Sequence, residues 1–195
     1  MKHKGNFPLI LGFLLILSGA LLFAGSEFLA ARNQKVAEDT AGRILALLPP
    51  ASQGIPENYS NPDMPALELD GTDYTAVLQI PAFGISLPVE SAWGDGKCDA
   101  CPRRYWDSAY NRSIIIGGSP AKGQFDFCAR LDLGDKITLT DMAGARFSYE
   151  VVRIDRRSQA GIYELSENTP DLVLFVRDRA SGGYIIVRCA LTPGM

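Results

Sequence analysis

The segment Leu172–Asp178 (LVLFVRD) determines how the rest of the chain is interpreted. Its five apolar residues in succession are typical of a strand buried on both faces, and the charged pair that follows marks the strand's end. A second apolar run, Tyr184–Cys189 (YIIVRC), comes after the glycine-containing segment Ser181–Gly183. The two runs predict neighbouring strands joined by a turn.

Upstream of this pair, the chain holds more short β-type runs. Five such segments are separated by glycine, proline and aspartate: 75–80, 85–89, 113–116, 136–140 and 147–154. Pro88 lies inside one of them, which favours an edge position because proline cannot donate a ladder hydrogen bond. No segment from 74 to 195 has the pattern of a long helix. Short strands at close spacing predict an all-β closed barrel or sandwich.

The N-terminal part has a different character. Phe7–Ala24 is an uncharged apolar run long enough to cross a bilayer core. Lys2 and Lys4 precede it and no basic residue follows before Arg32, so residues 1–6 are expected in the cytoplasm and the remainder outside the cell. We therefore predict a transmembrane signal anchor over 7–30. A cleaved signal peptide is the competing interpretation, but its apolar core is normally shorter.

Between the apolar run and the barrel, two further segments are expected. Residues 31–48 have apolar positions near helical spacing and predict a juxtamembrane helix, which Pro49-Pro50 ends. Residues 49–73 are rich in proline and turn-forming residues and are typical of a linker. The folded domain is then expected over 74–195.

Charge and cysteine content restrict the function classes. The net charge is −3, and basic residues are scattered except for two arginine pairs, 103–104 and 156–157. This pattern argues against nucleic-acid binding. The chain has four cysteines, all in the part expected outside the cell, where disulfides can persist.

Five motifs together resemble the bacterial sortases. Residues 78–89 (LQIPAFGISLPV) are similar to the hairpin L-x-I-P-x-x-x-I-x-L-P-V that opens the sortase domain, and 114–118 (IIIGG) resemble the strand V-V-I-A-G-H. The other three are 125–137, which fit F-x-x-L-x-x-L-x-x-G-D-x-I, 147–151, which fit F-x-Y-E-V, and 172–175, which fit the start of L-T-L-x-T-C. Their order and spacing imply a sortase-like closed barrel of about eight strands.

The resemblance also implies where catalytic residues would lie. Sortases are cysteine transpeptidases in which a thiolate attacks a sorting-signal peptide, a histidine moves protons and an arginine stabilises the oxyanion or the substrate carbonyl. In this chain the histidine position matches Ser119, the cysteine position Arg177 and the arginine position Tyr184. The only histidine is His3 and no cysteine occurs between 129 and 188, so no shift of alignment restores the site.

The four cysteines are alternative candidates for the catalytic nucleophile, and none fits this role well. Cys128 lies where the resemblance expects a core leucine, and Cys189 alternates with apolar residues, so both are expected to pack in the core. Cys98 and Cys101 form a C-x-x-C motif that fits half a zinc site, a redox pair, a local disulfide or two unpaired loop thiols. Without histidines to complete a zinc site, we expect no metal and no cofactor.

Two interpretations of Arg177 stay open. Its guanidinium either binds a peptide carbonyl or carboxylate in the former catalytic cleft, or it is a neutral change at an abandoned site. We therefore expect a membrane-anchored pseudo-sortase at the cell surface of a Gram-positive cell, facing the cell wall. Its partners would be a sorting-signal-like peptide, a surface protein or another sortase.

Two alternatives to this function come from other classes. One is a divergent transpeptidase that anchors surface proteins or pilins with a relocated thiol. The other is a redox or structural accessory protein built around Cys98 and Cys101.

Overall fold

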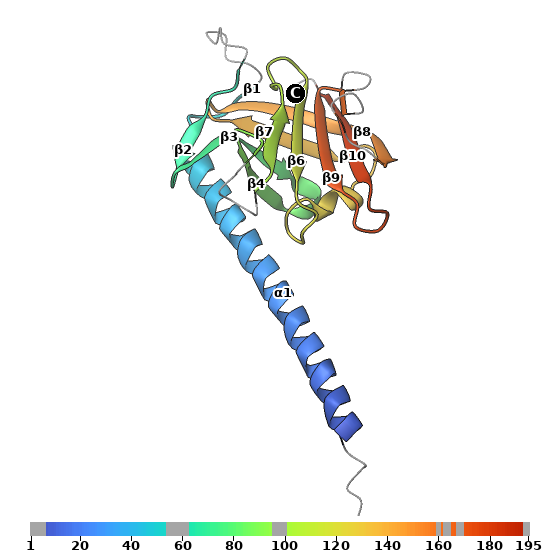
Figure 1. Cartoon of the computed structure of the whole chain (residues 1–195). Coiled ribbons are helices and arrows are strands. Elements are labelled where there is room, and N and C mark those ends of the chain that lie inside the picture. Colours follow the sequence, from blue (N-terminus) through green and yellow to red (C-terminus); the bar gives the residue numbers. More distant parts are fainter. Residues whose placement is uncertain are drawn as a thin grey trace, which may run out of the picture.

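A computed structural model describes the chain over residues 7–53, 63–94, 101–158, 161, 165–166 and 170–192. It consists of one long N-terminal helix and one β-barrel (Figure 1). The helix is α1, Phe7–Leu47. The strands are β1 (Ser52–Gln53), β2 (Leu67–Leu69), β3 (Thr72–Ile80), β4 (Ile85–Glu90), β5 (Arg103–Trp106), β6 (Ile114–Gly118), β7 (Lys136–Asp141), β8 (Ala145–Arg157), β9 (Leu172–Arg177) and β10 (Tyr184–Leu191). Two short 3-10 helices, Pro81–Phe83 and Asp126–Ala129, complete the elements.

The barrel is closed by eight strands, β3 to β10. Their order is β8-β10-β9-β6-β5-β4-β3, and β7 closes the ring because it pairs with both β3 and β8. The weakest connection is between β4 and β5, which share a single paired position, Glu90 opposite Arg103. The two remaining strands, β1 and β2, extend the sheet beside β8 and β3. The predicted barrel is thus confirmed.

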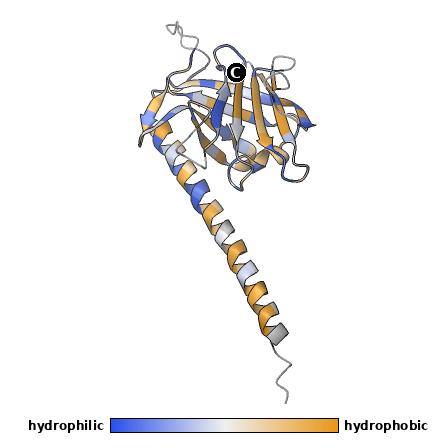
Figure 2. Cartoon of the chain, viewed as in Figure 1, coloured by the Kyte–Doolittle hydropathy of each residue, from blue (hydrophilic) through white to orange (hydrophobic). Residues whose placement is uncertain are grey.

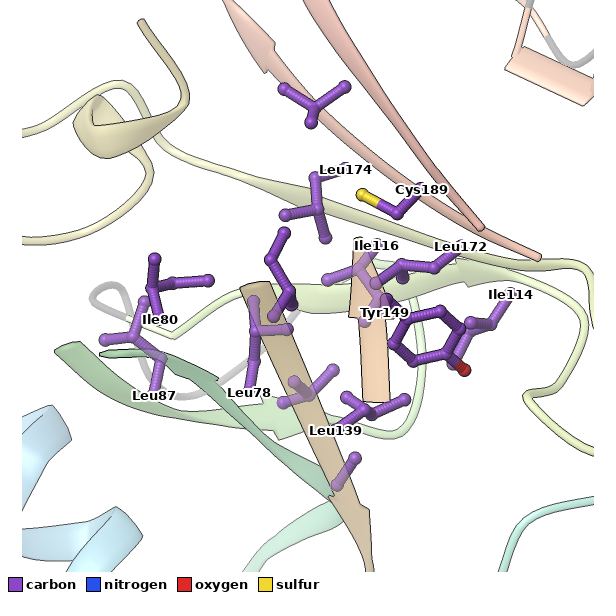
Figure 3. Packing of buried hydrophobic residues seen from close by; sticks show 14 of the residues in the cluster. Leu78, Ile80, Leu87, Ile114, Ile116, Leu139, Tyr149, Leu172, Leu174 and Cys189 are labelled. Carbon is purple, nitrogen blue, oxygen red and sulfur yellow. The ribbon is translucent and has the colours of Figure 1, made fainter. Parts of the chain in front are cut away.

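The barrel interior is filled by alternating side chains from most of its strands (Figure 3). Leu78 of β3, Leu87 of β4 and Leu174 of β9 are fully buried there. Cys189 of β10 lies in the same interior cluster, on the side of its strand that also carries Ile185 and Val187. Its expected place in the core is therefore confirmed.

The outer face of β6, β9 and β10 is also covered. Ile115, Val173, Phe175 and Ile186 form a second cluster with Leu165 from the segment before β9. Strands buried on both faces have continuous apolar sequences, since neither face is left to polar residues. This double burial explains why 172–176 and 114–116 contain no polar residue.

Helix α1 has two parts with different surroundings (Figure 2). Ala37, Ala41 and Ile44 are fully buried at helical spacing, on the part of α1 that packs against the barrel beside β4. In contrast, the apolar side chains of the first part, such as Ile16 and Leu22, are 73% and 77% exposed. By length and composition, α1 is apolar enough to cross a membrane.

Three details differ from the expected layout. The helical segments predicted at 7–30 and 31–48 form one continuous helix, because no proline separates them. The ends of the predicted linker 49–73 form β1 and β2 rather than a plain spacer. Strand β5 was not predicted, since its sequence RRYW lacks an alternating apolar pattern.

Candidate functional site

Of the three positions singled out by sequence, two lie on adjacent strands and the third directly follows a strand. Arg177 ends β9 and Tyr184 begins β10, and these two residues are directly opposite each other in the antiparallel ladder. On the other side of β9, Gly118 of β6 is opposite Val176, so Ser119 follows beside Arg177 along the parallel pair. Opposed residues are separated by about 5 Å between Cα atoms. The register thus places Arg177 and Tyr184 side by side at one end of the barrel, with Ser119 following the end of the neighbouring strand β6.

A fourth residue extends this row and was missed by the sequence analysis. Arg157, the last residue of β8, is opposite Tyr184 on that strand's other side. Directly opposed residues share one face of a sheet, so Tyr184 stands between Arg157 and Arg177 on that face. Both arginines are exposed, and Tyr184 is half-buried against the outer cluster. The sequence signal was the pair Arg156-Arg157, but its register could not be inferred.

The turn between β9 and β10 is held by Asp178. Its carboxylate accepts hydrogen bonds from the Ala180 backbone N–H at 2.9 Å and from the Ser181 hydroxyl at 2.8 Å. These contacts hold the pKa of Asp178 below its usual value, the Ser181 hydrogen bond being the larger cause. The Asp178 backbone N–H also donates to the Gly183 carbonyl at 2.8 Å. Ser181 therefore has a structural part in this turn.

Gly183 allows this turn to approach the end of β8. A β-carbon there would lie 2.4 Å from the backbone oxygen of Arg157, closer than atoms can pack. Between the turn and β8 is a pocket of about 350 Å³. Arg156, Arg157, Ser158 and Ser181–Gly183 line it.

At the other end of the row, Ser119 is the first residue of the loop after β6, and its hydroxyl bonds within that loop. Its hydroxyl accepts a hydrogen bond from the Ala121 backbone N–H at 3.2 Å, and its carbonyl accepts one from Phe125 at 3.0 Å. The loop continues to Gly123, whose added β-carbon would lie 2.4 Å from the side-chain oxygen of Gln34 in α1. Ser119 thus fixes a turn, and the sequence has no histidine after His3 to accept its proton.

Aromatic rings cover the outer face of the sheet around Phe175, which is two residues before Arg177 on β9. Trp93 and Tyr105 have ring centroids 5.0 Å apart, and Trp93 also lies 5.5 Å from Phe175 of β9. Gly117 of β6 makes this packing possible, since a β-carbon there would lie 2.5 Å from atoms of both Phe175 and Trp93. Sequence analysis did not predict this cluster, because Trp93 and Phe175 are 82 residues apart.

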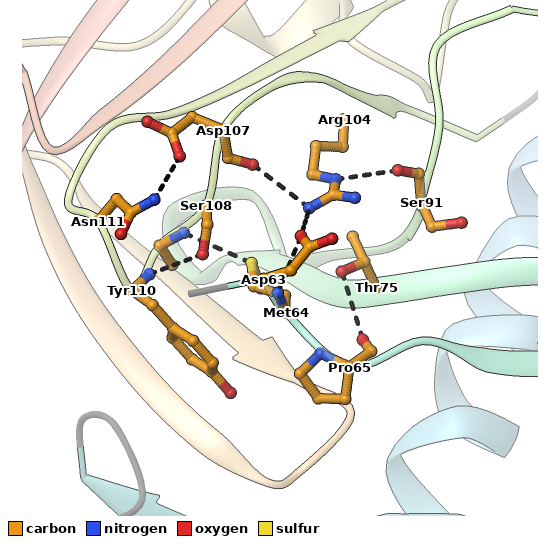
Figure 4. Close-up of polar contacts among 11 residues, drawn as sticks. Asp63, Met64, Pro65, Thr75, Ser91, Arg104, Asp107, Ser108, Tyr110 and Asn111 are labelled. Atoms are coloured by element: carbon orange, nitrogen blue, oxygen red, sulfur yellow. Dashed lines mark hydrogen bonds and ion pairs between the residues drawn. The ribbon is translucent and has the colours of Figure 1, made fainter. Parts of the chain in front are cut away.

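Beside these rings is a larger cleft of about 490 Å³, lined by Trp93, Trp106 and polar residues. Arg104 organises one wall of it (Figure 4). Its Nε donates to the Ser91 carbonyl at 2.9 Å, and its guanidinium pairs with Asp63. This pairing lowers the pKa of the Asp63 carboxyl through the Arg104 hydrogen bond.

The described thiols are unsuited to nucleophilic attack. Cys128 and Cys189 are free, with exposures of 1% and 0%. Burial away from water raises the pKa of both thiols, because it disfavours the charged thiolate. Cys101 is disulfide-bonded, so it supplies neither a thiolate nor a metal ligand. The other member of the C-x-x-C motif, Cys98, is outside the described residues.

One buried charge belongs to the scaffold. Arg188 is 2% exposed, and its Nε lies 3.1 Å from a carboxylate oxygen of Asp155. The same guanidinium donates to the Leu165 carbonyl at 2.8 Å, which holds Leu165 against the outer face. Among the residues that the structure describes, no group of acidic, histidine or cysteine side chains is arranged to hold a metal ion.

Comparison with solved structures decides the fold. Sortase C1 from Streptococcus agalactiae superposes with a TM-score of 0.56 at 18% identity, covering 66% of this chain and 72% of that one. The chain has a sortase-like fold. A lid mutant of sortase A from Corynebacterium diphtheriae gives 0.53 at 16% identity, over 63% and 72% of the two chains.

A third sortase, E1 from Streptomyces coelicolor with a tripeptide in its active site, gives a TM-score of 0.51 at 14% identity, over 62% and 88% of the two chains. No protein-family model matches the sequence, and no curated protein is similar to it. The likeness to sortases is therefore one of fold.

Proposed function

We propose that this chain is a membrane-anchored, catalytically inactive protein of sortase-like fold that binds a peptide segment of a partner at the cell surface. The observation that carries the proposal is the row at the carboxyl ends of β6 and β9. It presents a hydroxyl, two guanidinium groups and a phenol, and no thiol or imidazole.

Inactivity follows from the chemistry of these groups. Acyl transfer to cysteine needs a thiolate and a base that is able to return the proton to the leaving group. The free thiols Cys128 and Cys189 are buried with raised pKa values, and the sequence has no histidine beyond His3. A relocated thiol, the enzyme alternative, has no support among the described cysteines.

Peptide binding is supported by what the row retains. Arg177 is exposed, and a guanidinium donates several hydrogen bonds in a planar arrangement that suits a carboxylate or carbonyl. The Tyr184 ring packs against the outer cluster, which holds it in place beside the guanidinium. One sortase of similar fold is described with a tripeptide in its active site, so the fold accommodates short peptides there.

Anchoring is supported by α1, whose first part carries exposed apolar side chains that a bilayer would cover. With the N-terminus in the cytoplasm, the barrel would be outside the cell, where the disulfide of Cys101 is stable. That compartment also holds the surface proteins whose segments we expect the row to bind.

Binding of a sorting-signal peptide to the full-length chain tests the proposal. Arg177→Ala should weaken binding roughly ten- to a hundredfold, the loss expected for a hydrogen bond to a charged group. Arg146→Ala is the matched control, because Arg146 is an exposed arginine near the opposite end of β8. Equal affinity for the wild-type chain and the Arg177→Ala variant would show that the row does not bind the peptide.

A further inference from the structure

The end of the barrel that carries the row is strongly basic. Four exposed arginines gather there: Arg156 and Arg157 at the end of β8, Arg177 at the end of β9, and Arg179 in the following turn. We call these four residues the arginine patch. Two carboxylates are near them. Asp178 is largely buried by its turn contacts and lies 3.9 Å from Arg156, and Asp155 is paired with Arg153 and Arg188. A chain with a net charge of −3 thus concentrates positive charge at one place.

The arginine patch is at the end of the barrel that faces the apolar part of α1. The loop after β6, which begins at Ser119, lies against α1 at Gln34, ten residues after the uncharged run Phe7–Ala24 ends. Figure 1 shows the turn between β9 and β10 at that same end. Beyond this end, α1 continues as the apolar helix seen in Figure 2.

We propose that the arginine patch docks on anionic phospholipid headgroups of the membrane that α1 spans. The proposal rests on the anchoring role of α1 proposed above, and it gives the barrel a fixed orientation with its row turned toward the bilayer. A peptide reaching the row would then come from a membrane-proximal segment of the partner.

Charge complementarity supports this ligand. A lipid surface presents many phosphate groups in one plane. The arginines of the patch are spread over two strand ends and a turn, so several of them could pair with such a surface at once, whereas a single carboxylate could pair with only one or two. A basic residue near an anionic surface strengthens binding by about fivefold. Three or four such residues, attached to a membrane-spanning helix, would hold the barrel on the surface for most of the time.

The test uses the full-length chain in lipid nanodiscs, with a fluorophore on an Ala180→Cys variant in the exposed turn. Lipids with a quencher on the headgroup report the distance of this turn from the membrane. We expect stronger quenching in discs of phosphatidylcholine and phosphatidylglycerol than in discs of phosphatidylcholine alone. Arg157→Gln and Arg177→Gln should each lower the ratio of docked to undocked barrel about fivefold, and added salt should do the same.

Two control variants separate this proposal from the previous one. Arg146→Gln should leave quenching unchanged, since Arg146 is near the other end of β8. Arg177→Lys should keep docking, which depends on charge, but weaken peptide binding, which uses the planar guanidinium. Equal quenching in both kinds of disc, with the chain retained in them, would overturn the docking proposal and leave the anchor intact. A chain that fails to enter the discs would overturn both.

Discussion

The two buried thiols make the stability of the barrel depend on alkaline pH. Burial raises the pKa of Cys128 and Cys189 in the folded chain, whereas in the unfolded chain each thiol titrates near pH 8.5. Above that pH, the unfolded state loses protons that the folded state retains. Stability is therefore full below about pH 8.5 and falls as the pH rises further.

The size of this loss of stability follows from the pH interval over which the thiols titrate in the unfolded chain but not in the folded one. Each pH unit corresponds to about 1.4 kcal/mol per thiol, so from pH 8.5 to pH 10 each thiol lowers the free energy of unfolding by about 2 kcal/mol. The two thiols together give about 4 kcal/mol, a large part of the stability of a typical domain.

The measurement is urea unfolding of the full-length chain in detergent at several pH values, for the wild type and for Cys128→Ala and Cys189→Ala. Between pH 8.5 and pH 10, the free energy of unfolding of each variant should fall by about 2 kcal/mol less than that of the wild type. This difference does not depend on the variant's stability at neutral pH. This difference separates the thiols from lysines and tyrosines, which titrate in the same range in all three proteins.

Alkylation provides an independent check on the same reasoning. Iodoacetamide at about pH 8 should modify neither Cys128 nor Cys189 in the folded chain, and both after unfolding, because only an accessible thiolate reacts. Rapid alkylation of either cysteine in the folded chain, or an alkaline slope that the variants do not change, would refute the argument from burial.

Three further predictions concern the scaffold and the row. Gly117→Ala should lower the free energy of unfolding by about 1–3 kcal/mol and shift tryptophan fluorescence, because the new β-carbon would overlap the Phe175 ring; unchanged spectra would contradict the packing. Asp155→Asn should cost about 3 kcal/mol in thermal or denaturant unfolding, since it removes the charge of the Asp155 carboxylate beside the buried Arg188; a loss below 1 kcal/mol would contradict the contribution of this ion pair. Arg177→Cys alone should not create transpeptidase activity in a peptide-cleavage assay, because the new thiol would have no base; measurable turnover would contradict the assigned need for one.

The strands with strong apolar patterns could be predicted from sequence. The runs over 114–116 and 172–176 were recognised because burial on both faces leaves no polar residue in them. Strand β5 was missed because it pairs at the barrel's weakest connection and contains Arg103 and Arg104, whose side chains bind Glu90 and the Ser91 carbonyl. Tertiary contacts decide such a strand, and single-sequence patterns do not contain them.

The row itself was only partly predictable. Ser119, Arg177 and Tyr184 came from the motifs, since strand ends and a turn can be located in sequence. The addition of Arg157 required the pairing register between β8 and β10, which depends on a bulge at Arg188/Cys189. A bulge adds a residue to one strand and shifts every later partner, so its position could not be inferred from apolar alternation.

The most direct test of the proposed catalytic inactivity is a transpeptidation assay of the full-length chain with a sorting-signal peptide and an amine nucleophile. We expect no product above the rate without protein and no thioester adduct by mass spectrometry. Product formation that is lost in Cys128→Ala or Cys189→Ala would contradict it, because a buried thiol would then be serving as the nucleophile.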